Sequence, residues 1–399
     1  MADHTARRVL IVAPQPFYED RGTPIALRQV LHALGELGRP VDLVTYPVGA
    51  DIVVPGLRTF RAGNPFGFRS VPVGLSLRKL ILDVPLTVAL AGRLARERYA
   101  CVHAIEEAAF PAAVLARRYR IPMLYDMQSS LVEQMMRSPL LSVPPARGAL
   151  LAMERWLIRR SSLVVASAGL GERAQAMVPG VRVREWHFPS APADASATEV
   201  HALRARLGLS RSGPVVLYSG TFEAYQGLAE LIEAIPLVLA RSPTATFVFV
   251  GAERENELFA EGAAPGLIAA GALRVVERQP RSEMAAFLAL ADVLVSPRAY
   301  GGNLPLKIFD YLAAGRPIVA TDIPTHRTVL ADDRAVLVAP ETTALAGGIV
   351  DVLGDAPRAR RLAAAARHYA QMHFGWSRFV DSVDALYAEV TRHAAVARV

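Results

Sequence analysis

The sequence contains little cysteine and little lysine. Cys101 is the only cysteine in 399 residues, which excludes a disulfide framework and favours a reducing compartment, so we expect a cytoplasmic protein. Lys79 and Lys307 are the only lysines, although arginine is abundant. An enzyme that holds pyridoxal phosphate needs a lysine for that cofactor. With only two candidate lysines, this class of enzyme is disfavoured.

Metal-binding patterns and long hydrophobic runs are also missing. No Asp-x-Asp motif occurs and no ligand set has metal-binding spacing, so we expect no metal and no other cofactor. The nearest approach to a chelate is Glu253-x-Glu255-x-Glu257, which we interpret as a solvated surface. Residues 80–92 form the longest apolar stretch, which is too short for a membrane span and contains Asp83. We expect neither a transmembrane helix nor a signal peptide.

Positive charge is concentrated in one half of the chain. The formal net charge is +7, of which residues 1–190 contribute +9 and residues 191–399 contribute −2. A basic half indicates an anionic partner, such as an acidic lipid, a phosphate-bearing acceptor or a nucleic acid. A solvated basic face is the alternative. Because no nucleic-acid recognition motif accompanies the charge, we expect no nucleic-acid partner.

Two basic stretches of the first half are also rich in apolar residues. Residues 66–98 and 135–160 mix arginine with leucine, valine and aromatic side chains. Each fits an amphipathic segment that lies among lipid headgroups. Ordinary helices that pack on a sheet and keep a basic outer face are the alternative. The first interpretation predicts a peripheral enzyme at the inner face of the membrane, in contact with anionic lipid.

Short apolar runs alternate with longer helical patterns along the chain. Strands are expected at 9–13, 41–45, 101–104, 123–126, 163–166, 215–218, 246–250, 273–276, 293–296 and 318–320. This alternation predicts an α/β fold of two doubly wound, Rossmann-like domains that bind ligands at the carboxyl ends of their strands, facing a shared cleft. The expected parts are an N-terminal domain (1–188), a linker (189–213), a C-terminal domain (214–375) and a final helix (376–399) packed across the domain junction.

The strongest functional signal lies between residues 296 and 322. A strand ends at Ser296, a glycine-rich loop follows, and a helix is expected from Pro305 to Gly315. Proline and glycine stand at the positions that helix starts and helix ends favour. The free amide groups of a helix start can bind an anion.

Lys307 falls in the first turn of this expected helix. A cation there opposes the helix dipole, unless an anion such as a diphosphate binds beside it. Asp310 follows on the same helix face and is suited to accept hydrogen bonds from ribose hydroxyls. A simple surface pair between Lys307 and Asp310 is the alternative.

Two other glycine turns follow strands. Gly220 lies in such a turn within residues 215–227, and residues 21–24 form an Arg-Gly-Thr-Pro turn after the first strand. Backbone amides in these turns can reach a phosphate or a sugar. Each signal is weak by itself, because most strand-to-helix turns contain glycine.

The order and spacing of these segments resemble the retaining glycosyltransferases of the two-domain GT-B fold often called family 4. In that family, a Gly-Arg…Lys-Gly element opens the second domain and a Glu-x7-Glu motif precedes Ala-x-Gly-x-Pro-Val-Val-Ala. Residues 304–320 carry the specific part of a resemblance that covers nearly the whole chain. It implies an acceptor-side N-terminal domain, a nucleotide-sugar-binding C-terminal domain, and transfer of a hexosyl group to a hydroxyl with retention. It also implies a role in cell-envelope, glycolipid or polysaccharide synthesis, with a glycan or a lipid-linked acceptor.

The chain departs from the family pattern at residues that the family uses for catalysis. Asp310 corresponds to the second Glu of the paired motif, but Gly302 corresponds to the first, and Asn303 is the nearest polar residue. Gln128 corresponds to a histidine that is common on the acceptor side. The resemblance implies that the leaving diphosphate helps to deprotonate the acceptor, which needs stabilisation of charge more than a protein nucleophile.

The donor loop departs from the pattern too. Thr221 and Gln226 stand where the family has its arginine and its lysine. Lys307, Arg298 and the helix amides are therefore left to bind the diphosphate.

These patterns together give the candidate site residues. The catalytic candidates are Glu106, Gln128 and Asn303. The donor candidates are Gly22, Thr23, Gly220, Thr221, Gln226, Arg298, Asn303, Leu304, Pro305, Leu306, Lys307 and Asp310. The acceptor candidates are His103, Glu106, Glu107, Asp126 and Gln128, which follow or lie in two expected strands. Carboxylates at a strand end can bind hydroxyls or act as a base, whereas a buried structural histidine is the alternative for His103.

Three other functions stay open at this point. One is a catalytically silent subunit that binds a nucleotide-sugar and supports a true transferase. Another is a sugar-nucleotide epimerase of the same fold. The third is a dehydrogenase, for which Gly169-x-Gly171-x-x-Ala174 is a short match. This match lies late in its domain and lacks the acidic residue that should follow.

Overall fold

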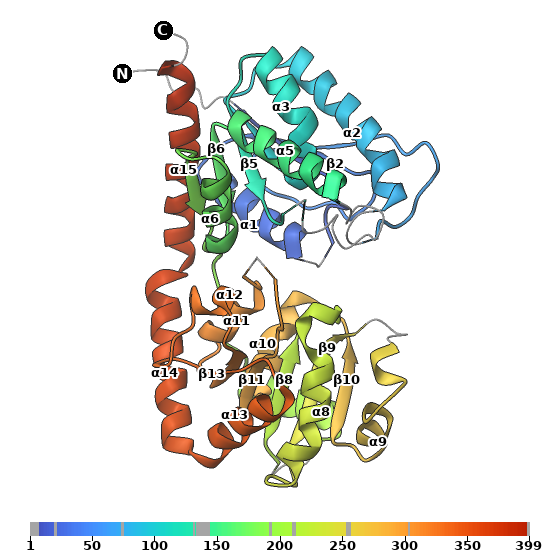
Figure 1. Ribbon diagram of the computed structural model, residues 1–399, viewed down its shortest axis with the longest axis vertical. Coiled ribbons are helices and arrows are strands. Elements are labelled where there is room, and N and C mark those ends of the chain that lie inside the picture. Colours follow the sequence, from blue (N-terminus) through green and yellow to red (C-terminus); the bar gives the residue numbers. More distant parts are fainter. Residues whose placement is uncertain are drawn as a thin grey trace. The chain divides into compact units, whose positions relative to one another are not determined.

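The chain folds into two compact units, each with its own sheet (Figure 1). This computed structural model describes residues 8–19, 22–72, 76–130, 132, 144–190, 194–209, 213–252, 257–301 and 304–396. The first unit comprises Met1–Phe188 and Ser377–Val399, and the second comprises Pro189–Trp376.

The first unit is built on a seven-stranded sheet in which all neighbouring strands are parallel, in the order β3-β2-β1-β4-β5-β6-β7. The strands are β1 (Val9–Ala13), β2 (Val41–Thr45), β3 (Leu57–Arg61), β4 (Val102–Ile105), β5 (Met123–Met127), β6 (Leu163–Ala166) and β7 (Val183–Glu185). The helices are α1 (Gly22–Glu36), α2 (Leu77–Arg96), η1 (Glu106–Ala108), α3 (Ala109–Arg118), α5 (Pro144–Arg160) and α6 (Ala168–Met177). Strands such as Val9–Ala13 are apolar throughout because helices cover both faces of a doubly wound sheet.

The second unit repeats this plan with a six-stranded parallel sheet, in the order β10-β9-β8-β11-β12-β13. The strands are β8 (Val215–Ser219), β9 (Thr246–Ala252), β10 (Leu273–Glu277), β11 (Val293–Ser296), β12 (Ile318–Thr321) and β13 (Val336–Val338). The helices are α7 (Ala197–Arg206), η2 (Ala224–Gln226), α8 (Leu228–Leu239), η3 (Glu257–Phe259), α9 (Ala264–Ala269), α10 (Arg281–Leu290), α11 (Lys307–Ala313), α12 (Pro324–Arg327), α13 (Thr342–Gly354) and α14 (Ala356–His373). The helix α7 lies in the predicted linker and pairs with α10 through Arg206 and Glu283.

The last helix, α15 (Trp376–Val396), returns to the first unit. Asp384 forms an ion pair with Arg39, and the Tyr387 hydroxyl lies 2.6 Å from Nδ1 of His103. The sequence prediction of two doubly wound parallel sheets and a C-terminal helix that crosses back is therefore confirmed. None of the helices in the described residues is both long enough and apolar enough to cross a bilayer.

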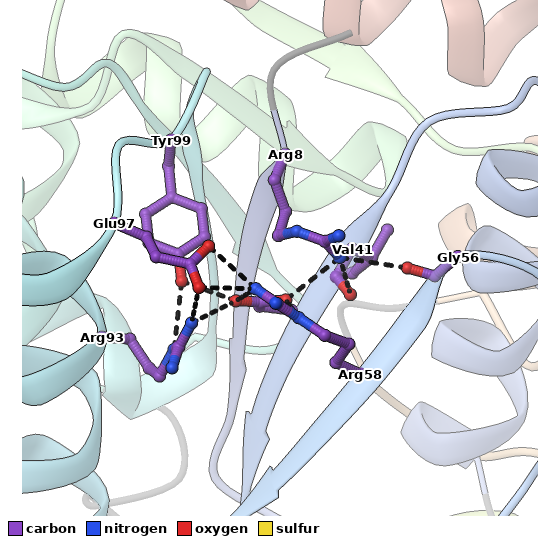
Figure 2. Close-up of polar contacts among 8 residues, drawn as sticks. Arg8, Val41, Gly56, Arg58, Arg93, Glu97 and Tyr99 are labelled. Atoms are coloured by element: carbon purple, nitrogen blue, oxygen red, sulfur yellow. Dashed lines mark hydrogen bonds and ion pairs between the residues drawn. The ribbon is translucent and has the colours of Figure 1, made fainter.

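A buried carboxylate ties together the amino-terminal edge of the first sheet. Asp42 in β2 is fully buried and accepts hydrogen bonds from Arg58 (2.7 and 2.8 Å), Arg93 (2.9 Å) and Tyr99 (2.6 Å). Arg8 adds an ion pair at 3.2 Å, and Figure 2 shows these side chains converging from separate elements. Burial alone would raise the pKa of Asp42, but the hydrogen bonds from Arg58 and Tyr99 hold it below its usual value.

Candidate functional site

The loop after β8 approaches other parts of the second unit closely. Gly220 has a backbone φ of +142°, and a Cβ atom there would lie 2.8 Å from Nζ of Lys307. Gly251 has a φ of +119°, and a Cβ atom on it would lie 2.1 Å from the carbonyl oxygen of Gly220. The positive φ favours glycine at both positions, and at Gly251 any side chain would also collide with the backbone of Gly220.

Lys307 is the first residue of α11, and its ammonium group lies against this loop. Nζ donates a hydrogen bond to Oε1 of Gln226 at 3.1 Å and lies 3.9 Å from the centroid of the Tyr218 ring. No carboxylate among the described residues pairs with it. Burial and the charge of Arg298 hold the pKa of Lys307 well below its usual value. An anion bound beside such a lysine would favour its charged form.

The helix α11 begins later than the sequence predicted. Its N-cap is Leu306, and Pro305 lies before the helix, so the predicted start at Pro305 is wrong by two residues. The physical reason is a tight turn, in which the carbonyl groups of Pro305 and Leu306 accept bonds from residues three positions ahead. Gly315 follows the helix with a φ of +63°, as expected for a helix exit.

The two other charged donor candidates, Arg298 and Asp310, have partners of their own. Arg298 is buried after β11, and its Nε donates to the carbonyl oxygen of Tyr300 at 2.9 Å. Asp310 forms an ion pair with Arg281 of α10 at 3.3 Å. Lys307 makes no ion pair with Asp310, so the alternative of a simple surface pair between these two residues is wrong.

Two buried side chains that the sequence analysis missed support these loops. His326 in α12 lies 3.0 Å from Oγ of Ser296 and 2.8 Å from the carbonyl oxygen of Thr321. Its burial lowers the pKa of His326 to about 4, so the ring is neutral at pH 7. The Tyr311 hydroxyl accepts a hydrogen bond from the Ser219 amide at 2.9 Å and joins α11 to β8. His326 lies outside the motif of residues 296–322, and nothing in the sequence marks Tyr311 within it, so only the tertiary contacts reveal the two roles.

Glu106 stands at the carboxyl edge of the first sheet, directly after β4. Its φ of +48° lies in the left-handed region, which costs a non-glycine residue about 1–3 kcal/mol. Burial and the charge of Glu107 raise the pKa of Glu106 to about 7. Oγ of Ser129 donates to its Oε1 at 3.3 Å. Both protonation states of this carboxyl group are therefore populated near neutral pH.

The neighbouring strand adds a second carboxylate. Asp126 in β5 is buried and accepts hydrogen bonds from Nε2 of Gln128 at 2.8 and 3.0 Å. His103 in β4 is fully buried, with Nε2 3.4 Å from Oδ2 of Asp126 and Nδ1 2.6 Å from the hydroxyl of Tyr387. These contacts fit the structural alternative for His103, and its place in an acceptor site stays a prediction.

The helix α2 brings two more charged residues to this edge. Lys79 forms an ion pair with Glu107, and the Tyr46 hydroxyl donates to Asp83 at 2.6 Å. Burial raises the pKa of Asp83 to about 6. In the sequence, Asp83 stands out only as a break in an apolar run. Its spacing of four from Lys79, which puts both residues on one helix face, was the available signal.

Comparison with known proteins identifies the family. A model of the "Glycosyl transferase 4-like domain" matches residues 21–169, and a model of "Glycosyl transferases group 1" matches residues 213–355. The chain belongs to the group 1 glycosyltransferases of the family 4 type.

Curated relatives and solved structures agree with this family. A phosphatidyl-myo-inositol mannosyltransferase of Mycobacterium tuberculosis is 29% identical over 231 residues, which cover 54% of this chain and 60% of that relative. The chain thus spans less than two thirds of that relative's length. A glycogen synthase of the same species is 27% identical over 360 residues, which cover 88% of this chain and 84% of the relative. A solved sucrose-phosphate synthase from Thermosynechococcus elongatus matches with a TM-score of 0.81 at 21% identity, over 97% of this chain and 100% of that chain, which shows the shared GT-B fold.

Within this group 1 glycosyltransferase, several predicted donor residues come together around Lys307. Gly220 and Gln226 contact its side chain, and Oγ1 of Thr221 accepts a bond from Nε2 of Gln226 at 3.4 Å. Leu304, Pro305 and Leu306 lead directly into α11. Their role in binding a donor stays a prediction.

Other predicted positions fall elsewhere. Gly22 and Thr23 open α1 in the first unit, where their role stays a prediction. Asn303, Gly302, Glu253 and Glu255 lie outside the described residues. Across the parts of the chain that the structure does describe, no three His, Cys, Asp or Glu side chains are grouped as a metal site would need.

Proposed function

We propose that this chain transfers a hexosyl group from a nucleotide-sugar to a hydroxyl of a lipid-linked acceptor, with retention at the anomeric carbon and without a metal ion. The observation that carries the donor half is Lys307, a cation that lies 3.1 Å from Gln226 and has no carboxylate partner among the described residues. The family membership of the chain supports the reaction class.

The diphosphate of the donor binds between the loop after β8 and the start of α11 in this proposal. Lys307 and Arg298 supply the positive charge, while the absence of a side chain on Gly220 lets the Lys307 ammonium group lie against the loop. During transfer the bond from the anomeric carbon to the diphosphate breaks, so negative charge develops on the leaving group. Fixed cations in a partly buried site stabilise such charge without reorganisation. Lys307 thus stabilises the negative charge of the diphosphate, which the uncharged loop residues Thr221 and Gln226 cannot do.

The acceptor hydroxyl binds at the carboxyl edge of the first sheet. Glu106 accepts a hydrogen bond from this hydroxyl, and Gln128 with Asp126 orients it. The new bond forms from the hydroxyl oxygen to the anomeric carbon, and its proton passes to the leaving diphosphate. Ionised Glu106 is a stronger hydrogen-bond acceptor than the protonated form, so we expect the rate to rise with pH through about 7.

A lipid-linked acceptor is supported by the outer face of α2. Leu82, Leu86, Leu90 and Leu94 face the core, while Leu77, Leu80, Val84 and Val88 keep between 52% and 73% of their surface exposed at helical spacing. Such a row of apolar side chains fits insertion among lipid acyl chains. In the first turn of α2, Lys79 forms an ion pair with Glu107, next to the proposed acceptor site. The name of the mannosyltransferase relative refers to a phosphatidyl lipid, which agrees with a lipid-linked acceptor.

A thermal-shift screen tests the donor half of this proposal. The purified chain is heated with UDP-, GDP-, ADP- and dTDP-sugars in the presence of a chelator. We expect one nucleotide to raise the melting temperature of the parent and to leave that of the Lys307→Ala variant unchanged. Lys79→Ala removes the other lysine of the chain and should keep the shift. Loss of the shift in both variants, or no shift with any nucleotide, would contradict the donor site.

Turnover separates an enzyme from a silent subunit. Gly302 stands where the family motif has its first glutamate, so one carboxylate of the motif is missing. This observation favours a subunit that binds the nucleotide-sugar but does not transfer the sugar. We expect release of free nucleoside diphosphate when lipid extract is added to the donor that gave the shift. A clear thermal shift with no release, for any lipid or glycan fraction, would favour the silent subunit instead.

A further inference from the structure

A pocket on the first unit, between α3 and α5, has the composition of a phosphate-binding site. Its volume is about 660 Å³, and its lining residues are Arg117, Ala152, Arg155, Trp156, Arg159 and Arg160. Four of these six side chains are arginines, and none is acidic. Figure 1 shows α3 and α5 over the same region of the sheet.

The four arginines lack the partners that other arginines of this unit have. Arg58, Arg93 and Arg39 each form ion pairs with carboxylates. Within the described residues, no hydrogen bond or ion pair holds the side chains of the arginines in the pocket. Arg155 and Arg159 are also four residues apart on one helix, where like charges repel each other.

Aromatic packing fixes the shape of the pocket. The Trp156 ring stacks on Phe110 with centroids 6.4 Å apart and planes inclined by 6°. The Arg160 guanidinium lies 4.8 Å from the centroid of Trp156. Ala152, one turn before Trp156, leaves space between the longer side chains. The stacked Trp156 ring thus places the Arg160 guanidinium at the wall of the pocket.

The helix dipole accounts for only part of this arrangement. Arg117, Arg159 and Arg160 lie in the last turns of their helices, where a cation is favourable. Arg155 lies before the last turn of α5, beyond the reach of the helix dipole. Helix capping therefore does not account for its place in the pocket.

The pocket is separate from the proposed acceptor site. The helices α3 and α5 begin after the carboxyl ends of β4 and β5 and lead back to the opposite edge of the sheet. Arg117 and Arg159 lie near the carboxyl ends of these helices, whereas Glu106 and Gln128 lie near the carboxyl ends of the strands. A ligand in this pocket would bind away from the residues assigned to transfer.

We propose that this pocket binds a phosphate-bearing group, either a soluble phosphate ester or the headgroup of an anionic lipid. Planar guanidinium groups bind phosphate oxygens in pairs, and several unpaired arginines in one pocket attract a ligand with more than one negative charge. The inference does not depend on sugar transfer. A bound phosphate would join α3 to α5, and a lipid headgroup would in addition hold the first unit on the membrane.

Binding measurements with two probes test the proposal in a Lys307→Ala background, which removes the proposed donor site as a second phosphate site. Inorganic pyrophosphate is titrated by calorimetry, and vesicles of phosphatidylglycerol or of phosphatidylcholine are used in sedimentation. The test variant is Arg155→Gln/Arg159→Gln. The matched control, Arg118→Gln/Arg182→Gln, removes the same charge from two exposed arginines outside the pocket. The melting temperature of each variant is measured alongside.

We expect the test variant to bind the active probe about tenfold more weakly, with the control within about twofold of the parent. Weakening of pyrophosphate binding identifies a soluble phosphate ligand. Weakening with phosphatidylglycerol vesicles alone identifies a lipid headgroup. Equal weakening by the test and control variants would mean that net charge explains binding and would overturn the pocket. Failure of the parent to bind either probe would overturn it as well.

Discussion

Two carboxylates at opposite edges of the first sheet have opposite surroundings. Asp42, at the amino-terminal edge, has hydrogen bonds from Arg58, Arg93 and Tyr99, and its pKa is held below the usual value. Glu106, at the carboxyl edge, has a backbone φ of +48° and a pKa raised to about 7. Both carboxylates belong to the first unit. At the amino-terminal edge the buried carboxylate is stabilised by several partners. At the carboxyl edge the surroundings of the carboxylate disfavour its ionised form.

The physical chemistry of each edge explains the contrast. Buried ionised groups are tolerated where several cations share one anion, as the arginines do around Asp42. At the other edge the charges of Glu107 and Asp126 disfavour the ionised form of Glu106, and Lys79 offsets only part of this effect. An unfavourable carboxylate and a strained backbone at a strand end are features typical of functional sites.

The largest effect on stability is expected from removing the carboxylate of Asp42 at the amino-terminal edge. Asp42→Ala leaves the guanidinium groups around it without their carboxylate, and we expect a loss of about 3–5 kcal/mol in the free energy of unfolding. Urea denaturation at pH 7 measures this loss. Because the pKa of Asp42 is lowered in the folded state, its stabilisation is present above the usual carboxyl pKa and is lost as the pH falls through the folded value. A variant as stable as the parent would show that the network contributes nothing.

Removing the charge of Glu106 should stabilise the folded protein, whereas removing the carboxylate of Asp42 should destabilise it. A raised pKa means that the folded state loses stability as the pH rises from the usual value of Glu towards about 7. We therefore expect Glu106→Gln to raise the melting temperature at pH 8 but not at pH 4, and to slow sugar transfer by about 100-fold. Thermal melts at both pH values and initial rates test this together. A lower melting temperature at pH 8 with unchanged activity would assign Glu106 to structure.

The neighbours of Glu106 should tune its pKa in opposite directions. Glu107→Gln removes a charge that raises the pKa of Glu106, so the midpoint of the rate-against-pH curve should move to lower pH. Lys79→Gln removes a charge that lowers this pKa, so the midpoint should move to higher pH. Initial rates between pH 5 and pH 9 measure both shifts. A midpoint that is the same in both variants and the parent would mean that another group controls the rate.

The smallest effect is expected at an exposed pair of the same unit. Arg39 and Asp384 lie 2.6 Å apart with partly exposed side chains. Exposed ion pairs contribute about 0.2–1 kcal/mol. We expect Asp384→Asn to cost no more than this in urea denaturation, and less at high salt because ions screen the pair. A loss as large as that of Asp42→Ala would show that the position of α15 depends on this one contact.

The fold was largely predictable from local patterns. Runs such as Val9–Ala13 and Val215–Ser219 are apolar and bounded by turns, so their strand state follows from the sequence. The start of α11 was misplaced at Pro305, because proline suits both a helix start and the turn before it. Such boundaries depend on a balance between nearly equal local hydrogen-bond patterns, and the sequence does not specify which one forms.

The candidate site was only partly predictable. Lys307 was singled out because it breaks a local rule of helix charge, and that signal needs no tertiary information. Its contacts with Gln226 and Tyr218 join residues more than eighty positions apart, so only the structure could place them together. The role of His326 behind Ser296 was not visible in the sequence for the same reason.

The sequence by itself determined the alternation of strands and helices, the two sheets and the positions of the glycine turns, because these depend on the periodicity and backbone preferences of neighbouring residues. The tertiary structure decided the electrostatic state of each charged side chain. Asp310 pairs with Arg281 instead of Lys307, and Glu106 rather than Asp42 has the raised pKa. The physical reason is that the pKa and the partners of a charge depend on burial and on distances of a few ångströms between residues far apart in the chain.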